Sequence, residues 1–189
     1  MSFDQTIVHC SAPALCGIKP SCLFSMDRKL FDVEVDKIRE WNKELTKEGS
    51  IIVPLFRSNV LVLLFVYNRD LLTRLCSSKE AKRYLTSKGY IFTDDVQLLL
   101  AELFRRLAHN DAFPHEVGFF LGYPLEDVIA FEKTQGKGFR YSGLWKVYGD
   151  VEAARHKISK YNACRFTCSK LLDEGLSIPA VVHTYKISC

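Results

Sequence analysis

The feature that most constrains the fold is an uninterrupted run of eight apolar residues, Val60–Tyr67. A helix that crosses a bilayer needs about 20 apolar residues, so this run is too short to span a membrane. Apolar residues at every position predict a central β-strand covered on both faces, because a half-exposed strand would alternate. The preceding segment, Ser50–Phe56, predicts the partner strand of a hairpin that turns at residues 57–59. Pro54 cannot donate a ladder hydrogen bond, and it therefore predicts that this partner lies at a sheet edge.

The segment before the hairpin has the spacing of an amphipathic helix. Residues Lys29–Lys47 place Phe31, Ile38 and Leu45 on one face and alternating charges on the other. Asp27 precedes them and is suited to accept hydrogen bonds from the first turn. We therefore expect a helix here that packs one face on the hairpin.

The chain beyond the hairpin predicts further helices. Three are expected within residues 69–110, where Ser78 and Thr93 are suited to cap the second and third. A long helix is expected over residues 151–174, with Asp150 as its cap. The chain is therefore predicted to be rich in helix on the C-terminal side of its hairpin.

The two ends of the chain carry weaker signals. Residues Cys10–Pro20 include Pro13 and Gly17, and this composition predicts a loop. A short strand, Ser21–Met26, is expected to follow it, whereas the tail at residues 176–189 has no clear signal.

Together these elements predict an α+β fold: a small, mostly antiparallel sheet with a central hairpin, packed against several helices as a two-layer sandwich. At 189 residues the chain is expected to form a single domain, residues 1–189. Its 48% hydrophobic content, 25% charged content and net charge of +4 are ordinary for a soluble protein. The first residues lack the pattern of a secretory signal, so we expect a cytoplasmic location and no membrane partner.

The most residue-specific stretch, residues 113–128, predicts a helix, a tight turn and a second helix. A proline before each helix suits its first turn, and Gly122 suits the left-handed turn between them. The spacing over residues 114–133 also matches a helix-turn-helix. A DNA-reading helix needs basic and amide side chains, however, and this one begins with Glu126 and Asp127. Binding to nucleic acid is therefore an alternative that the charges disfavour.

Four side chains in this stretch, His115, Glu116, Tyr123 and Asp127, have no architectural role that the sequence predicts. His115 and Glu116 are candidate acid–base groups for catalysis. They do not form a zinc-protease motif, because the second histidine it requires is replaced by Phe119. Tyr123 and Asp127 are candidate ligand-binding residues.

The segment Gly143–Asp150 alternates as a strand would, with Trp145 directed into the core. Lys146 and Tyr148 are further candidate ligand-binding residues. The sequence leaves two roles open for Lys146, which is either a ligand contact or a surface residue whose stem covers apolar neighbours.

The chain has seven cysteines, an odd number, and we expect reduced thiols that serve mostly as small apolar residues. Cys164 and Cys168 lie one helical turn apart and share a face, so with His9 or Cys10 they offer one alternative, a metal site. Buried reduced thiols are favoured, and no metal site is predicted. Cys10, placed in the expected loop, is the candidate reactive thiol.

These motifs resemble a family of uncharacterised bacterial proteins, a domain-of-unknown-function family common in clostridia and related anaerobes. The resemblance rests on Phe113–Val128 and Trp145–Asp150, and also on His9-Cys10, Gly17-Ile18-Lys19, Tyr161 and Cys164-Arg165. It covers nearly the whole chain and implies a single domain in a bacterial cytoplasm, without an activity or a cofactor. Ser142 stands where the family pattern has a cysteine.

Three functions of different classes follow from these residues. The first is the binding of a small ligand or a protein partner by His115, Glu116, Tyr123, Lys146 and Tyr148, gathered in one pocket. The second is a thiol-dependent enzyme that uses Cys10, with the neighbouring acid–base pair. The third is nucleic-acid binding through the helical corner. The identity of the ligand, the cofactor and the oligomeric state stay open at this point.

Overall fold

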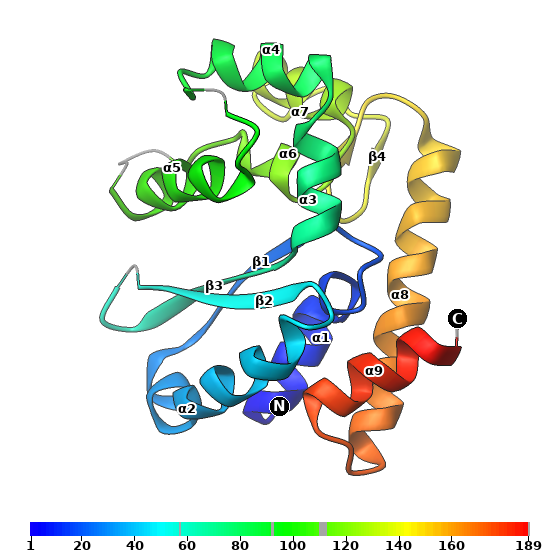
Figure 1. The fold of residues 1–189 in the computed structure, drawn as a ribbon. Coiled ribbons are helices and arrows are strands. Elements are labelled where there is room, and N and C mark those ends of the chain that lie inside the picture. Colours follow the sequence, from blue (N-terminus) through cyan, green and yellow to red (C-terminus); the bar gives the residue numbers. More distant parts are fainter. Residues whose placement is uncertain (57, 92, 110–112, 189) are drawn as a thin grey trace.

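The computed structural model describes residues 1–56, 58–91, 93–109 and 113–188, and a three-stranded antiparallel sheet lies at its centre (Figure 1). The strands are β1 (Ser21–Asp27), β2 (Ser50–Phe56) and β3 (Leu61–Asn68), in the order β1-β3-β2. The predicted hairpin and its edge strand are therefore confirmed. Residue 57 of the predicted turn lies outside the described residues.

Helices cover both faces of this sheet (Figure 1). One face carries α1 (Phe3–Leu15), α2 (Arg28–Leu45), α8 (Val151–Asp173) and α9 (Ile178–Ser188). The other carries α3 (Arg69–Cys76), α4 (Lys79–Ser87), α5 (Val96–His109), α6 (Val117–Phe120) and α7 (Leu125–Thr134).

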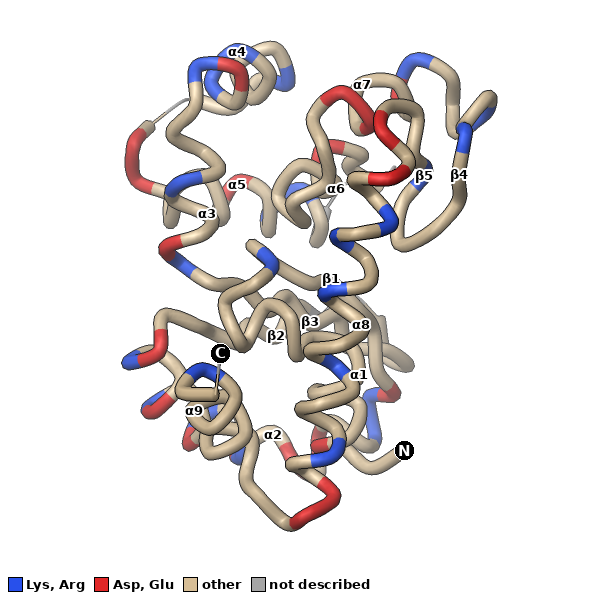
Figure 2. The backbone as a smooth tube through the Cα atoms, turned by 90° about the vertical axis from the view of Figure 1, so that its right-hand side faces the viewer, with Lys and Arg blue, Asp and Glu red and all other residues tan. Residues whose placement is uncertain are grey.

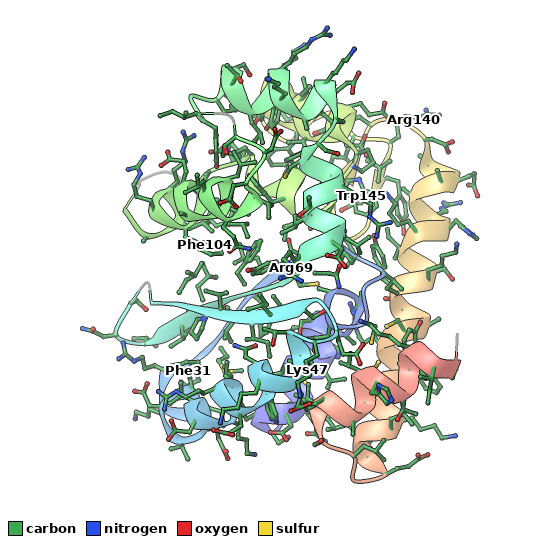
Figure 3. All side chains as sticks on the ribbon, viewed as in Figure 1. Phe31, Lys47, Arg69, Phe104, Arg140 and Trp145 are labelled. Carbon is green, nitrogen blue, oxygen red and sulfur yellow. The ribbon has the colours of Figure 1, made fainter. Side chains whose placement is uncertain are left out.

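The α+β class is confirmed, but the expected two-layer sandwich is wrong because the sheet is the middle of three layers. Strand β3 sends Val62, Leu64 and Val66 into one core and Phe65 and Tyr67 into the other. Its unbroken apolar run thus requires a helical layer on each side. Phe31 of α2 and Phe104 of α5 mark the two layers on opposite sides of the sheet (Figure 3).

The N-terminal segment corrects a second prediction, because the expected loop Cys10–Pro20 is largely helical. Ser2 and Gln5 form a reciprocal capping box that starts α1, and the helix continues through Pro13 to Leu15. Pro13 lies in the last turn of α1 and removes one backbone donor there. The Pro13 carbonyl then accepts hydrogen bonds from the backbone N–H groups of Ile18 and Lys19, both at 2.9 Å. This tight turn fixes where the Lys19 side chain begins.

Most predicted helix starts are confirmed by their caps. The side chains of Asp27, Ser78 and Asp150 accept hydrogen bonds from the first turns of α2, α4 and α8. Helix α5 is the exception, because it begins two residues later than expected. There the carboxylate of Asp95, rather than the hydroxyl of Thr93, accepts the 2.9 Å hydrogen bond from the N–H group at residue 97.

The tail contains a helix, α9, which the sequence reasoning missed. Ile178, Val181, Val182 and Tyr185 have helical spacing and pack on the α1–α2 core, so a signal was present but short. Pro179 lies in the first turn, where a missing N–H group costs little.

Helix α8 joins the two helical layers, because it runs alongside both of them (Figure 1). Its first turns pack on a small cluster around Trp145 and Val147, and its last turns enter the core below the sheet. Between α7 and α8 lies a short hairpin of β4 (Tyr141–Ser142) and β5 (Lys146–Val147). The strand expected at Gly143–Asp150 is therefore only two residues long.

Candidate functional site

A cavity of about 480 Å³ lies between the α6–α7 corner and the β4–β5 hairpin, and we call it the motif cavity. Four of the residues that the sequence singled out line it: His115, Tyr123, Asp127 and Lys146. Most of the remaining wall is apolar and comes from the same motifs, including Val117, Leu121, Val128, Phe131, Leu144 and Trp145. The structure thus brings together residues from two separate motifs around one space.

The corner that forms one wall depends on two glycines. The first predicted helix is only one turn, α6, and Gly122 follows it at φ +77°, as expected for a left-handed turn. A Cβ atom at Gly122 would lie 2.6 Å from Cδ of Pro20. A Cβ atom at Gly118 would lie 3.2 Å from the ring of Tyr123. The close approach at this corner therefore sets the position of the Tyr123 side chain.

Tyr123 forms the floor of the cavity together with Trp145. Their rings stack with centroids 5.0 Å apart and planes 20° apart. The Tyr123 hydroxyl donates a 3.2 Å hydrogen bond to the Leu144 carbonyl, so it is tied to the hairpin as well. Burial raises the pKa of Tyr123 to about 12, and the phenol therefore stays protonated near neutral pH.

Asp127 holds the two motifs together. One carboxylate oxygen accepts a 2.7 Å hydrogen bond from Nε1 of Trp145. The other accepts from the backbone N–H groups of Tyr148 and Gly149, at 2.8 and 2.9 Å. The side chain is only 3% exposed and lies in the first turn of α7, where a negative charge is favourable. Asp127 lines the cavity, but its oxygen atoms are committed to the protein.

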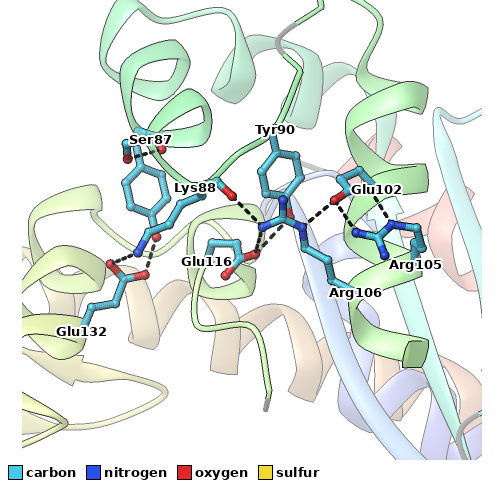
Figure 4. A network of polar contacts seen from close by, with 9 residues as sticks. Ser87, Lys88, Tyr90, Glu102, Arg105, Arg106, Glu116 and Glu132 are labelled. Carbon is cyan, nitrogen blue, oxygen red and sulfur yellow. Dashed lines mark hydrogen bonds and ion pairs between the residues drawn. The ribbon is translucent and has the colours of Figure 1, made fainter. Parts of the chain in front are cut away.

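Glu116 is placed in a different environment from its neighbour His115. Its carboxylate accepts a 2.9 Å hydrogen bond from Arg106, which also pairs with Glu102 at 2.7 Å and donates to the Lys88 carbonyl (Figure 4). The Arg106 guanidinium lies over the ring of Tyr90, whose hydroxyl also contacts Glu116. Glu116 does not line the motif cavity, and this buried ion pair links α5 to the start of α6.

His115 and Lys146 lie at the rim of the motif cavity. His115 is exposed and contacts the ring of Phe131 edge-on at 5.3 Å. The Lys146 ammonium donates a 2.9 Å hydrogen bond to the Ser142 hydroxyl and lies 3.9 Å from the centre of the Phe139 ring. Both are polar side chains among the residues that line the motif cavity.

Tyr148 does not join them. Its hydroxyl accepts a 3.1 Å hydrogen bond from Thr134 on α7, and its ring lies outside the residues that line the motif cavity. The backbone of Tyr148, rather than its side chain, serves the site through its bond to Asp127.

A second, smaller cavity of about 140 Å³ adjoins the first, and we call it the cationic cavity. Both cavities are lined by Leu121, Tyr123 and Leu144. The other lining residues come from α1, the turn after it, β1 and α8, and they include Cys10, Lys19, Cys22, Tyr161 and Arg165. Cys10 and the Tyr123 motif therefore lie at one site, although Cys10 is on a helix and not in the expected loop.

The two thiols of the cationic cavity are not activated. Burial raises the pKa of Cys10, and the nearby Arg165 only partly offsets this effect. Burial also raises the pKa of Cys22, against a smaller opposing effect of Lys19. Since the thiolate is the nucleophile, this environment does not favour the attack that a thiol enzyme needs.

Three other cysteines form a separate buried cluster. The sulfur atoms of Cys16, Cys164 and Cys168 all lie within 4.8 Å of one another. Cys164 and Cys168 share a face as expected, but the third member of the group is Cys16, not His9 or Cys10. Hydrogen bonds from Cys16 and Cys168 lower the pKa of Cys164, because they stabilise its thiolate. Three thiols at such distances are a set that a thiophilic metal ion can use.

The residues with helix-turn-helix spacing form a compact corner between α6 and α7. Its second helix, α7, opens with two acidic residues, Glu126 and Asp127. Lys and Arg residues are distributed over the whole chain rather than gathered beside this corner (Figure 2). Neither feature suits contact with a polyanion.

Most of the chain matches a known protein family. Residues 7–182 match a family described as "Protein of unknown function (DUF3793)". The chain belongs to this family. Every candidate residue lies inside the matched range of DUF3793, from Cys10 to Tyr148, and so do Lys19 and Arg165. Neither the curated proteins nor the solved structures provide a match. In the described part of the chain, no helix combines the length and the apolar character needed to cross a bilayer.

Sequence reasoning missed Lys19, Tyr161 and Arg165 as parts of a site. They appeared only as points of resemblance, because α1, α8 and the turn after α1 meet only in the folded chain. Lys19 stands between Ile18 and Pro20, in the turn where the backbone N–H groups of Ile18 and Lys19 donate to the Pro13 carbonyl.

Proposed function

We propose that this protein binds a small organic ligand in the motif cavity. The observation that carries the proposal is the lining of that cavity. The cavity has a volume of about 480 Å³, and its wall is mostly apolar with a few polar side chains. Ligand sites in proteins are typically concave, mostly apolar and roughly 300–1,000 Å³ in volume. Catalysis is not needed to account for these residues.

The wall is also held by contacts within the chain, which supports binding by a preformed site. Asp127 fixes Trp145 and the hairpin with three hydrogen bonds, and Tyr123 is fixed by stacking and by its bond to Leu144. A wall that is held in place before binding loses little conformational entropy when the ligand arrives.

The alternatives receive less support. A thiol-dependent reaction at Cys10 lacks an activated thiolate and lacks Glu116, whose carboxylate is paired with Arg106. Nucleic-acid binding at the corner is disfavoured by the acidic start of α7.

The test is a titration with N-phenyl-1-naphthylamine, a neutral aromatic probe whose fluorescence rises in an apolar environment. We expect saturable binding to the intact chain. Leu144 lines the cavity and is 39% exposed, so Leu144→Asn removes apolar contact with little effect on folding. Leu98 on α5 is 59% exposed and lies outside the cavity lining, so Leu98→Asn is the matched control. Equal affinity of both variants, or no saturable binding, contradicts the proposal.

A further inference from the structure

The cationic cavity contains a buried lysine. Lys19 is only 7% exposed. Its ammonium lies 3.7 Å from Sγ of Cys22 and over the rings of Tyr123 and Tyr161, at 5.5 and 5.9 Å from their centres. Within residues 1–56, 58–91, 93–109 and 113–188, no carboxylate pairs with it.

A second cation, Arg165, lines the same cavity. Its Nε atom is buried and has no hydrogen-bond partner, and in the described chain no acidic side chain forms an ion pair with it. One of its terminal nitrogens donates to the side chain of Asn162 on the same helix, at 3.3 Å. Buried donors are almost always satisfied, so an orphan donor of this kind indicates a partner that comes from outside the chain.

Among the described residues, no acidic side chain lines the cationic cavity. Burial raises the pKa values of Cys10 and Cys22, so both thiols stay neutral near pH 7. A buried cation without a partner is unfavourable, and the usual compensation is a negative charge held by hydrogen bonds.

We propose that Lys19 and Arg165 form a binding site for an oxyanion, a carboxylate or phosphate group carried by the ligand of the motif cavity. This inference rests on the proposed function for the ligand's apolar part. Arginine Nε and its neighbouring nitrogen suit the two oxygen atoms of such a group, and the lysine ammonium adds a point charge.

The size and position of the cationic cavity fit this role. Its volume of about 140 Å³ corresponds to roughly four to five water molecules at about 30 Å³ each, which is enough for one oxyanion group. The two cavities share Leu121, Tyr123 and Leu144, so a ligand can place its apolar body in one and its charged head in the other.

The test compares two probes that differ by one anionic group: 1-anilinonaphthalene-8-sulfonate and the neutral N-phenyl-1-naphthylamine. We expect the chain to bind the sulfonate at least about tenfold more tightly. Lys19→Met should abolish that preference and leave the affinity for the neutral probe unchanged. Arg165→Met is a second variant with the same expectation. Lys160→Met, which removes an exposed lysine from the same helix, should keep the preference.

The oxyanion site is overturned if the chain does not prefer the sulfonate probe, or if Lys19→Met keeps that preference. Binding of the neutral probe tests the proposed function separately. If the neutral probe does not bind, the proposed function fails, and inorganic phosphate then decides the oxyanion site alone. Phosphate should raise the melting temperature of the intact chain and of Lys160→Met but not of Lys19→Met. The absence of a Lys19-dependent shift overturns the site.

Discussion

The carboxylate of Asp127 provides the sharpest stability prediction, because one oxygen faces an indole and the other faces two backbone donors. In Asp127→Asn the amide is nearly isosteric but has one acceptor in place of two. Whichever way the amide is turned, an NH₂ group faces Nε1–H of Trp145 or the backbone N–H groups of Tyr148 and Gly149. A donor then opposes a donor in a position that is 3% exposed.

The size of this effect follows from the bonds that are lost. A hydrogen bond to a charged group contributes about 1.5–3 kcal/mol, and a buried donor left unsatisfied costs about 1–3 kcal/mol. Asp127→Asn should therefore lower the free energy of unfolding by about 2–4 kcal/mol. Loss of the charge at the start of α7 adds about 0.3–1 kcal/mol.

The assay is urea unfolding followed by circular dichroism, applied to a double-mutant cycle. Trp145→Phe removes the indole donor, so the clash with an asparagine at residue 127 disappears in that background. We expect the two substitutions to be coupled by at least about 1 kcal/mol, as residues in direct contact usually are. A loss below about 0.5 kcal/mol for Asp127→Asn, or strictly additive effects, would refute the reasoning.

Three further predictions concern other parts of the chain. Gly122→Ala should lower the free energy of unfolding by about 2–4 kcal/mol, because a positive φ and a clash with the Pro20 ring combine. Gly138→Ala, at φ +72° with no neighbour within 4 Å, should lower it by only about 1 kcal/mol. Thermal melts of the two variants measure the difference. Glu102 has a pKa lowered to about 2 by its hydrogen bonds to Arg105 and Arg106, so its stabilising effect is complete above about pH 4.5 and is lost as the pH falls towards 2. The urea midpoint should fall over that range less steeply in Glu102→Gln, and an unchanged slope contradicts the assignment. The raised pKa of Cys10 predicts alkylation by iodoacetamide more slowly than free cysteine at pH 7, and faster alkylation contradicts it.

Local patterns predicted the elements whose signals are complete within a short window. The unbroken apolar run of β3, the edge proline at residue 54 and the caps at Asp27, Ser78 and Asp150 all have their expected structures. Helix α1 was missed because Pro13 and Gly17 indicated a loop, although Ser2 and Gln5 form a capping box that starts the helix.

The candidate site was predicted less completely, because the face to which a side chain points depends on tertiary packing. His115 and Glu116 are adjacent, yet one lies at the rim of the motif cavity and the other forms a buried ion pair with Arg106. The cationic cavity joins Lys19 to Arg165, which no local pattern relates. Propensity and spacing describe elements, whereas this site arises where α1, α8 and the α6–α7 corner meet.

The central claim is that the motif cavity binds a small ligand, and Trp145 tests it most directly because it forms part of the cavity wall. The chain has two tryptophans, and Trp41 packs on Phe3 in the core below the sheet, so Trp41→Phe leaves Trp145 as the single indole reporter. Titration of that variant with N-phenyl-1-naphthylamine should quench Trp145 emission by energy transfer, saturably and with one probe per chain. Saturable binding without quenching of Trp145, or quenching that rises linearly without saturation, would contradict the claim.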